Sequence, residues 1–99
     1  MTNKNAKRSP VHPGRILKRE LGEAGLSANA AALAFRIPAN RLTEIINGKR
    51  SVSADTALRL GRFFGTSAQM WMNLQSQYEL QVAEDASAAK IEREVEPLM

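Results

Sequence analysis

The strongest structural signal in this chain lies between Ser27 and Arg50, in the segment SANAAALAFRIPANRLTEIINGKR. It reads as two short helices with a tight turn between them and a basic loop after them. Pro38 separates the helices, because proline holds the preceding residue extended and is well suited to open a helix. Ala32 is small where the helices should cross, and Leu42 and Ile45 are apolar at helical spacing. This pattern is that of a helix-turn-helix, whose second helix enters the DNA major groove.

The second helix of this motif carries polar side chains opposite its apolar face. Arginine can pair with guanine through two hydrogen bonds, asparagine can pair with adenine, and threonine can touch a thymine methyl. We therefore expect base reading by Ala39, Asn40, Arg41 and Thr43, with a plain solvated helix face as the alternative. Glu44 is either an acceptor for cytosine or a surface salt-bridge partner, and we favour the second.

Phosphate contacts are expected on both sides of this helix. Lys49 and Arg50 lie in the loop after it, where the DNA backbone passes in this architecture. A helix N-terminus also attracts phosphate, so we include the residues at the start of the preceding helix among the predicted phosphate contacts. The predicted phosphate-binding residues are Ser27, Asn29, Lys49, Arg50, Ser51 and Ser53.

Charge is distributed unevenly along the 99 residues, which suffice for one domain. The net charge is +4, but residues 1–50 hold ten Lys or Arg against three Glu, whereas residues 51–99 hold four against seven acidic residues. A polyanionic partner would therefore meet the N-terminal half.

Several functional classes are disfavoured by composition. The chain has no cysteine and a single histidine, His12, so we expect no metal, no cofactor and no catalytic centre. We expect His12 to precede or cap the first helix. No apolar run approaches the roughly 20 residues that span a bilayer, and the N-terminus has no secretory signal pattern. The expected location is the cytoplasm, in association with the nucleoid and with no membrane.

The remaining helices are predicted from capping residues and apolar spacing. A first helix opens at Pro13 and ends near Gly22 or Gly25, and Ser27 caps the second. Asn47-Gly48 ends the third helix, because both residues tolerate the left-handed conformation. The fourth runs from its cap at Ser53 to Gly65, and the fifth starts at Thr66 or Ser67.

The predicted fifth helix has two apolar faces. Trp71, Leu74, Tyr78 and Val82 share one side, on which aromatic residues are more typical of a core than of a ligand pocket. A helix packed only within its own domain needs one such face. The second face therefore predicts a two-fold dimer interface, formed by Met72, Leu80 and Ala83.

The domain organisation follows from these segments. We expect a basic flexible arm over residues 1–11, a helix-turn-helix domain with its dimerising fifth helix over 12–83, and an acidic tail over 84–99. The tail is either a short amphipathic helix or disordered.

Three runs carry a family resemblance: HPGRILKREL, LSANAAALAFRIPANRLTEIINGKRSVSADTALRLGRFFGTSAQMWMNLQ and YELQVA. They resemble the Cro-type (XRE) helix-turn-helix regulators and, within them, the HigA-type antitoxins related to virulence-associated protein I. The resemblance implies an all-α, compact five-helix bundle of the lambda-repressor-like DNA-binding fold. It also implies a homodimer that binds an inverted repeat of double-stranded operator DNA, represses its own operon and neutralises a small basic mRNA-cleaving toxin.

Two residues depart from the pattern of this family. Ala28 stands where many members have glutamine, so one common DNA contact is expected to be missing. Arg36 stands where a turn glycine is usual, which predicts a strained arginine at positive φ.

Three functions remain open from the sequence. The leading interpretation is an antitoxin that represses its own operon. The alternatives are a stand-alone XRE-type transcriptional regulator without a toxin, and a protein-interaction module. A toxin would bind either the acidic tail, through Ile91 and its neighbours, or the bundle, at a first helix carrying Ile16 and Leu17.

Overall fold

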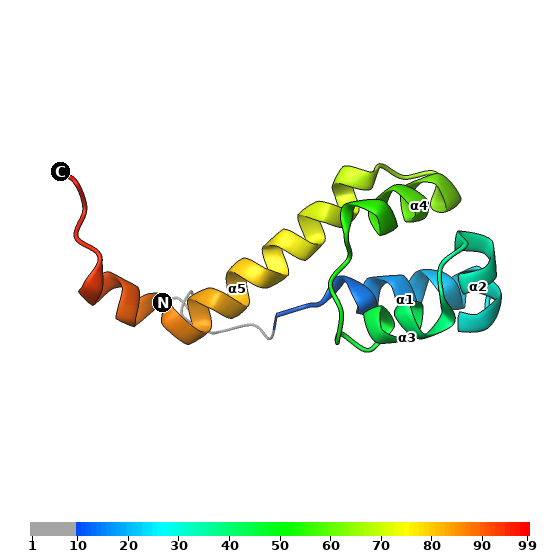
Figure 1. Ribbon diagram of the computed structural model, residues 1–99, viewed down its shortest axis with the longest axis horizontal. Helices are drawn as coiled ribbons and strands as arrows, with labels where there is room; N and C mark the ends of the chain where they lie inside the picture. The colour runs from blue at the N-terminus through cyan, green and yellow to red at the C-terminus, as the bar shows by residue number, and fades with distance from the viewer. Residues whose placement is uncertain (1–9) are drawn as a thin grey trace.

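The computed structural model describes residues 10–99, and the expected arm over 1–11 lies outside the described residues except for Pro10 and Val11. The chain forms five helices in the order and number predicted, and no strand occurs within the described range. They are α1 (Pro13–Glu23), α2 (Ala28–Phe35), α3 (Ala39–Ile46), α4 (Ala54–Phe64) and α5 (Ala68–Glu94). Figure 1 shows α1, α2 and α3 packed together, with α4 and the start of α5 closing the bundle.

Serine side chains begin three of the helices. Ser27, Ser53 and Ser67 each accept a hydrogen bond from the backbone N–H three residues later, at 3.0–3.2 Å. Such a cap satisfies one of the four N–H groups that a helix leaves without a partner and stabilises it by about 1 kcal/mol. The predicted starts of α2 and α4 are confirmed, and Ser67 is the residue that caps α5.

Left-handed residues end the helices as predicted. Gly65 closes α4 with φ +73°, and Gly48 follows α3 with φ +76°. Asn47, the C-cap of α3, keeps a negative φ of −85°, so Gly48 alone makes the left-handed turn there. Arg36 ends α2 at φ 60° and ψ 46°, which confirms the expected positive φ at this position.

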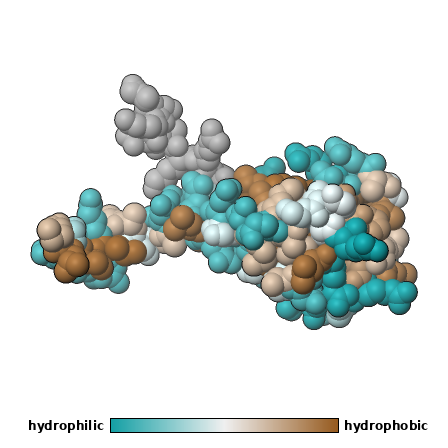
Figure 2. All heavy atoms as spheres, turned by 90° about the horizontal axis from the view of Figure 1, so that it is seen from above, coloured by the Kyte–Doolittle hydropathy of each residue, from teal (hydrophilic) through white to brown (hydrophobic). Residues whose placement is uncertain are grey.

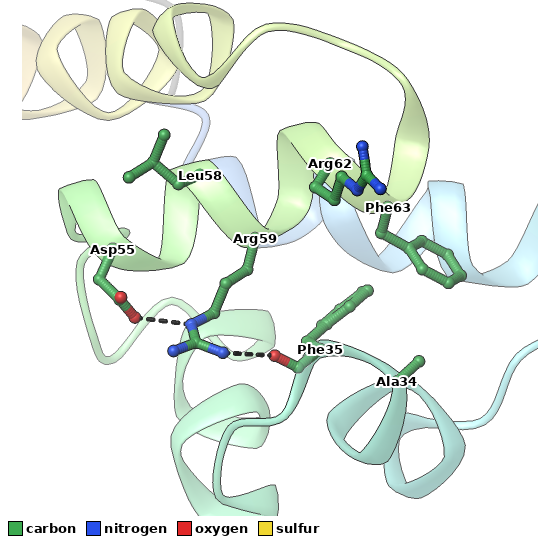
Figure 3. Close-up of a pocket in the computed structure, with 7 residues that line it drawn as sticks. All are labelled: Ala34, Phe35, Asp55, Leu58, Arg59, Arg62 and Phe63. Atoms are coloured by element: carbon green, nitrogen blue, oxygen red, sulfur yellow. Dashed lines mark hydrogen bonds and ion pairs between the residues drawn. The ribbon is translucent and has the colours of Figure 1, made fainter.

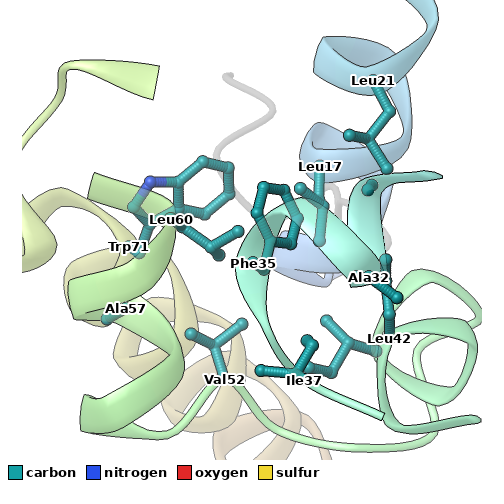
Figure 4. Close-up of a cluster of buried hydrophobic side chains, with 12 residues drawn as sticks. Leu17, Leu21, Ala32, Phe35, Ile37, Leu42, Val52, Ala57, Leu60 and Trp71 are labelled. Atoms are coloured by element: carbon teal, nitrogen blue, oxygen red, sulfur yellow. The ribbon is translucent and has the colours of Figure 1, made fainter. Parts of the chain in front are cut away.

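The core lies where all five helices meet (Figure 4). Leu17, Leu42, Leu60 and Trp71 have at most 1% of their surface exposed. A buried leucine side chain stabilises a fold by about 1.5–3 kcal/mol, so these residues orient the helices. Gly14 lets α1 approach the end of α3, because a Cβ there would collide with the carbonyl of Ile45.

α5 is 27 residues long and extends well beyond the bundle (Figure 1). The domain boundary expected at Ala83 falls inside this continuous helix, and helical structure stops only at Glu94. Val82, which shares a side of the helix with Trp71 and Leu74, is exposed because α5 has left the bundle at that point. None of the helices in residues 10–99 is long and apolar enough to cross a membrane.

Candidate nucleic-acid interface

The second helix of the motif, α3, is held by one apolar face and exposes the other. Leu42 and Ile45 are both completely buried, which fixes the rotation of the helix about its axis. That rotation leaves the predicted base-reading residues outside the core: Ala39, Asn40 and Thr43 are exposed and Arg41 is half-buried. The start of α3 therefore offers one amide, one guanidinium and one hydroxyl to a partner.

Arg41 lies in the field of a carboxylate from α4. A hydrogen bond from Arg59 is the main reason that the pKa of Asp55 is lowered, and the charges of Arg59 and Arg41 contribute further. Asp55 is exposed, so its attraction for Arg41 is screened by water.

The loop after α3 carries the basic residues predicted to meet phosphate. Lys49 is exposed, and its backbone N–H donates to the carbonyl of Glu44 at 2.8 Å. Arg50 is also exposed, and its Nε donates to a carboxylate oxygen of Glu44 at 2.7 Å. The salt-bridge interpretation of Glu44 is thereby confirmed, and this ion pair joins α3 to the loop.

The three predicted serines differ in what their hydroxyl groups contact. The hydroxyls of Ser27 and Ser53 accept the capping bonds of α2 and α4, while Asn29 is exposed on the first turn of α2. The hydroxyl of Ser51 instead donates to the carboxylate of Glu79 on α5 at 3.3 Å. The positive ends of α2 and α4 remain open to an anion, whereas Ser51 faces a negative charge.

Sequence reasoning missed the residue that holds this loop. Gln75 on α5 is only 4% exposed, and its Oε1 accepts a hydrogen bond from the Val52 N–H at 2.8 Å. A signal was present, because Gln75 follows Trp71 by four residues and so interrupts the apolar side of the predicted fifth helix with a polar group.

A second missed residue, Arg59, supports the turn of the motif (Figure 3). Its Nη1 donates to the carbonyls of Phe35 at 3.0 Å and Arg36 at 3.4 Å, and its Nε donates to Asp55 at 2.8 Å. These carbonyls lie at the C-terminal end of α2, where helix carbonyls have no intrahelical donor. Arg59 therefore anchors the strained Arg36 turn to α4.

His12 caps α1, as expected. Its Nδ1 accepts a hydrogen bond from the Gly14 N–H at 2.9 Å, and its ring meets Tyr78 edge-on at 4.8 Å between centroids. Burial lowers the pKa of His12, against the opposing effects of a hydrogen bond with the Arg50 backbone and the charge of Glu79. Neutral His12 therefore links α1, the loop and α5.

The expected second apolar face of α5 is present only in part. Met72 is half-buried and packs against the core, because the first turns of α5 lie between α1 and α4. Leu80 is 61% exposed and Ala83 is exposed too, since both lie beyond that contact.

Comparisons with known proteins agree with this geometry. The chain matches the helix-turn-helix family over residues 17–71. It is 49% identical to virulence-associated protein I of Dichelobacter nodosus over 75 residues, which are 75% of this chain and 69% of the relative.

Two solved structures are similar over nearly the whole chain. A HigA-family addiction module antidote protein from Coxiella burnetii is 52% identical, with a TM-score of 0.88 over 91% of this chain and 99% of the other. The Pseudomonas aeruginosa antitoxin HigA with the higBA promoter is 49% identical, with the same TM-score and coverage. The chain therefore belongs to the helix-turn-helix family and, within it, to the group that contains virulence-associated protein I and the HigA antitoxins.

Proposed function

We propose that this chain is a DNA-binding antitoxin, not an enzyme, which represses its own operon and neutralises a small basic mRNA-cleaving toxin in the cytoplasm. One observation carries the proposal: the polar face of α3 is exposed beside a basic loop, in a chain 49% identical to an antitoxin HigA solved with its promoter. Family membership supports a non-enzymatic, DNA-binding role.

Base reading is assigned to the start of α3. Asn40 and Arg41 are the two polar side chains there that can each form two hydrogen bonds with a base edge, to adenine and guanine respectively. Ala39 and Thr43 complete the contact surface, through close approach and a methyl group. The supporting evidence is that these four residues lie outside the core that buries Leu42 and Ile45, with Asn40 and Thr43 on the opposite side of the helix and Arg41 half-buried.

Phosphate binding is assigned to the loop and to the helix starts that flank α3. Lys49 and Arg50 supply the charge, and Ser27, Asn29 and Ser53 bring the positive ends of α2 and α4 towards the DNA backbone. The support for phosphate binding by Ser51 is weaker, because its hydroxyl donates a hydrogen bond to the Glu79 carboxylate. These contacts orient the protein and carry little sequence information.

A homodimer through α5 would present two such surfaces to an inverted repeat. Support comes from an apolar hollow of about 340 Å³ on the exposed part of α5, lined by Leu80, Ala83, Glu84, Ala88, Ile91 and Glu92. Figure 2 shows hydrophobic side chains at the end of the molecule that lies away from the bundle. Leu80 and Ala83 lie in the hollow, whereas Met72 would contribute only its exposed edge.

For the toxin we propose the bundle rather than the tail. A hollow of about 280 Å³ opens between α1 and α5 and is lined by Ile16, Arg19, Glu20, Phe64, Thr66, Met70, Trp71 and Leu74. Its walls are mostly apolar, with charged side chains at one edge, as protein interfaces are. Of the two expected contacts on the first helix, Ile16 remains accessible and Leu17 is completely buried.

The test is rescue of bacterial growth. The expected toxin, encoded by the gene next to the gene of this chain, is expressed together with the unchanged chain or with its Arg41→Ala, Met70→Asp or Ile91→Asp variant. We expect rescue by the unchanged chain, Arg41→Ala and Ile91→Asp, and loss of rescue with Met70→Asp. Gln69→Asp is the matched control, since it puts the same charge on the neighbouring exposed residue of α5.

Each result has a distinct meaning. Rescue by Met70→Asp with failure of Ile91→Asp would assign the toxin to the tail instead. A neighbouring protein that is harmless when expressed alone would refute the antitoxin function and leave a stand-alone transcriptional regulator. A DNA affinity of this chain that depends neither on the DNA sequence nor on the salt concentration would favour a protein-interaction module.

A further inference from the structure

Gln75 is a buried polar side chain whose hydrogen-bonding groups all have partners. A backbone N–H can donate only to the carboxamide oxygen, so the bond from Val52 fixes the orientation of the amide. The Nε2 group then faces Glu79 and Ser51, with distances of 2.9 Å to the Glu79 carboxylate and 3.4 Å to the Ser51 hydroxyl. One side chain of α5 therefore contacts two consecutive residues of the loop.

Glu79 closes this arrangement into a ring. Its Oε2 accepts hydrogen bonds from Gln75 and from the Ser51 hydroxyl, the latter at 3.3 Å. Ser51 donates to Glu79 and accepts from Gln75, so each polar atom in the ring is matched with the opposite kind. The loop residues lie 23 to 28 positions away from these two residues of α5, and the contact exists only in the folded chain.

We infer that Gln75 and Glu79 position the DNA-facing loop by fastening it to α5. The inference rests on the proposed operator binding and adds to it two positioning residues that touch no DNA. Lys49 and Arg50 directly precede the fastened residues Ser51 and Val52, so their approach to phosphate depends on where α5 holds the loop.

The placement of the pair on α5 has a consequence for the whole assembly. Leu80, which lies in the proposed dimer surface, directly follows Glu79 on the same helix. The helix that would join two copies thus also sets the position of each loop. In a dimer, the separation of the two loops would be fixed through α5 and would match two half-sites of fixed spacing.

A swap of the two side chains tests the pair. Gln75→Glu keeps the shape and an acceptor for Val52, but it sets two carboxylates against each other. The double variant Gln75→Glu/Glu79→Gln reverses the roles and restores a donor opposite each acceptor. Gln77→Glu is the matched control, because it adds the same charge at an exposed position two residues along α5.

The probe is a fluorescent duplex from the promoter region of the chain's own gene, together with base-substituted copies of it. Gln75→Glu is expected to weaken DNA binding by about tenfold. The factor should be similar for every duplex, because the loop contacts phosphates and not bases. The double variant and Gln77→Glu are expected to remain within about threefold of the unchanged chain. Light scattering and thermal melting show in parallel that each variant keeps its mass and its fold.

The outcomes separate this inference from the proposed function. Unchanged binding by Gln75→Glu, an equal loss with Gln77→Glu, or no recovery in the double variant would overturn the positioning role while leaving operator binding intact. If the unchanged chain does not distinguish the promoter from scrambled DNA, the proposed function itself is refuted, and the inference falls with it. Exchange of the Val52 amide hydrogen reports the fastening without DNA. It should quicken in Gln75→Glu, where repulsion from Glu79 moves the acceptor away from Val52, and slow again in the double variant.

Discussion

Replacement of Arg36 by glycine should stabilise the protein. Arg36 ends α2 at φ 60°, where the Cβ of an ordinary residue is crowded and the left-handed conformation costs about 1–2 kcal/mol. Glycine escapes this penalty but loses about 0.4–1 kcal/mol more chain entropy on folding. The bonds from Arg59 go to backbone carbonyls of Phe35 and Arg36, so the variant keeps them. The expected net gain in the free energy of unfolding is about 0.5–1 kcal/mol.

Urea denaturation followed by helical circular dichroism measures this gain. Arg36→Gly should raise the midpoint without changing the slope, and the melting temperature should rise by about 3–6 °C. Arg36→Ala is the control, because it removes the same exposed side chain and charge but keeps the Cβ. Equal stability of the glycine and alanine variants would show that the left-handed turn is not strained, and the reasoning would be wrong.

Three further predictions follow from the interface, from α5 and from His12. Arg41→Ala should cost about 1–3 kcal/mol of operator-binding free energy and relax the preference at one base pair, whereas Lys49→Ala should lower the affinity for all DNA sequences alike and flatten its salt dependence. Binding to a panel of base-substituted operators at two salt concentrations distinguishes the two effects. An intact base preference in Arg41→Ala would refute the assignment. Leu80→Asp should yield a monomer by light scattering, and an unchanged dimer would move the interface elsewhere. The pKa of His12 is lowered in the folded chain, so the stability that it contributes is present above its unfolded-state pKa of about 6.5 and is lost as the pH falls through its folded-state pKa. The free energy of unfolding measured from pH 7.5 to 5 should show this loss. His12→Asn, which can still cap α1, should make the loss of stability smaller.

Most of the fold could be predicted because its signals are local. A serine before a helix, a glycine after one and an apolar residue every three or four positions act within a few residues of each other. The same periodicity placed the exposed face of α3, since burying Leu42 and Ile45 leaves only one side for Asn40 and Arg41. The positive φ of Arg36 was likewise predicted, from its place in the motif.

Local sequence signals were enough to predict the five helices, the exposed face of α3 and the excess of positive charge in the N-terminal half. Contacts between distant parts of the chain decided which polar side chains hold the turn before α3 and the loop after it. Gln75 reaches Val52 and Arg59 reaches Phe35 across 23 and 24 residues of chain, and no spacing rule connects residues so far apart. The same limit applies to α5: periodicity defines the faces of a helix, but the point at which the helix leaves the bundle decides where each face is covered. Met72 is therefore partly buried, whereas Val82 lies beyond the bundle in solvent.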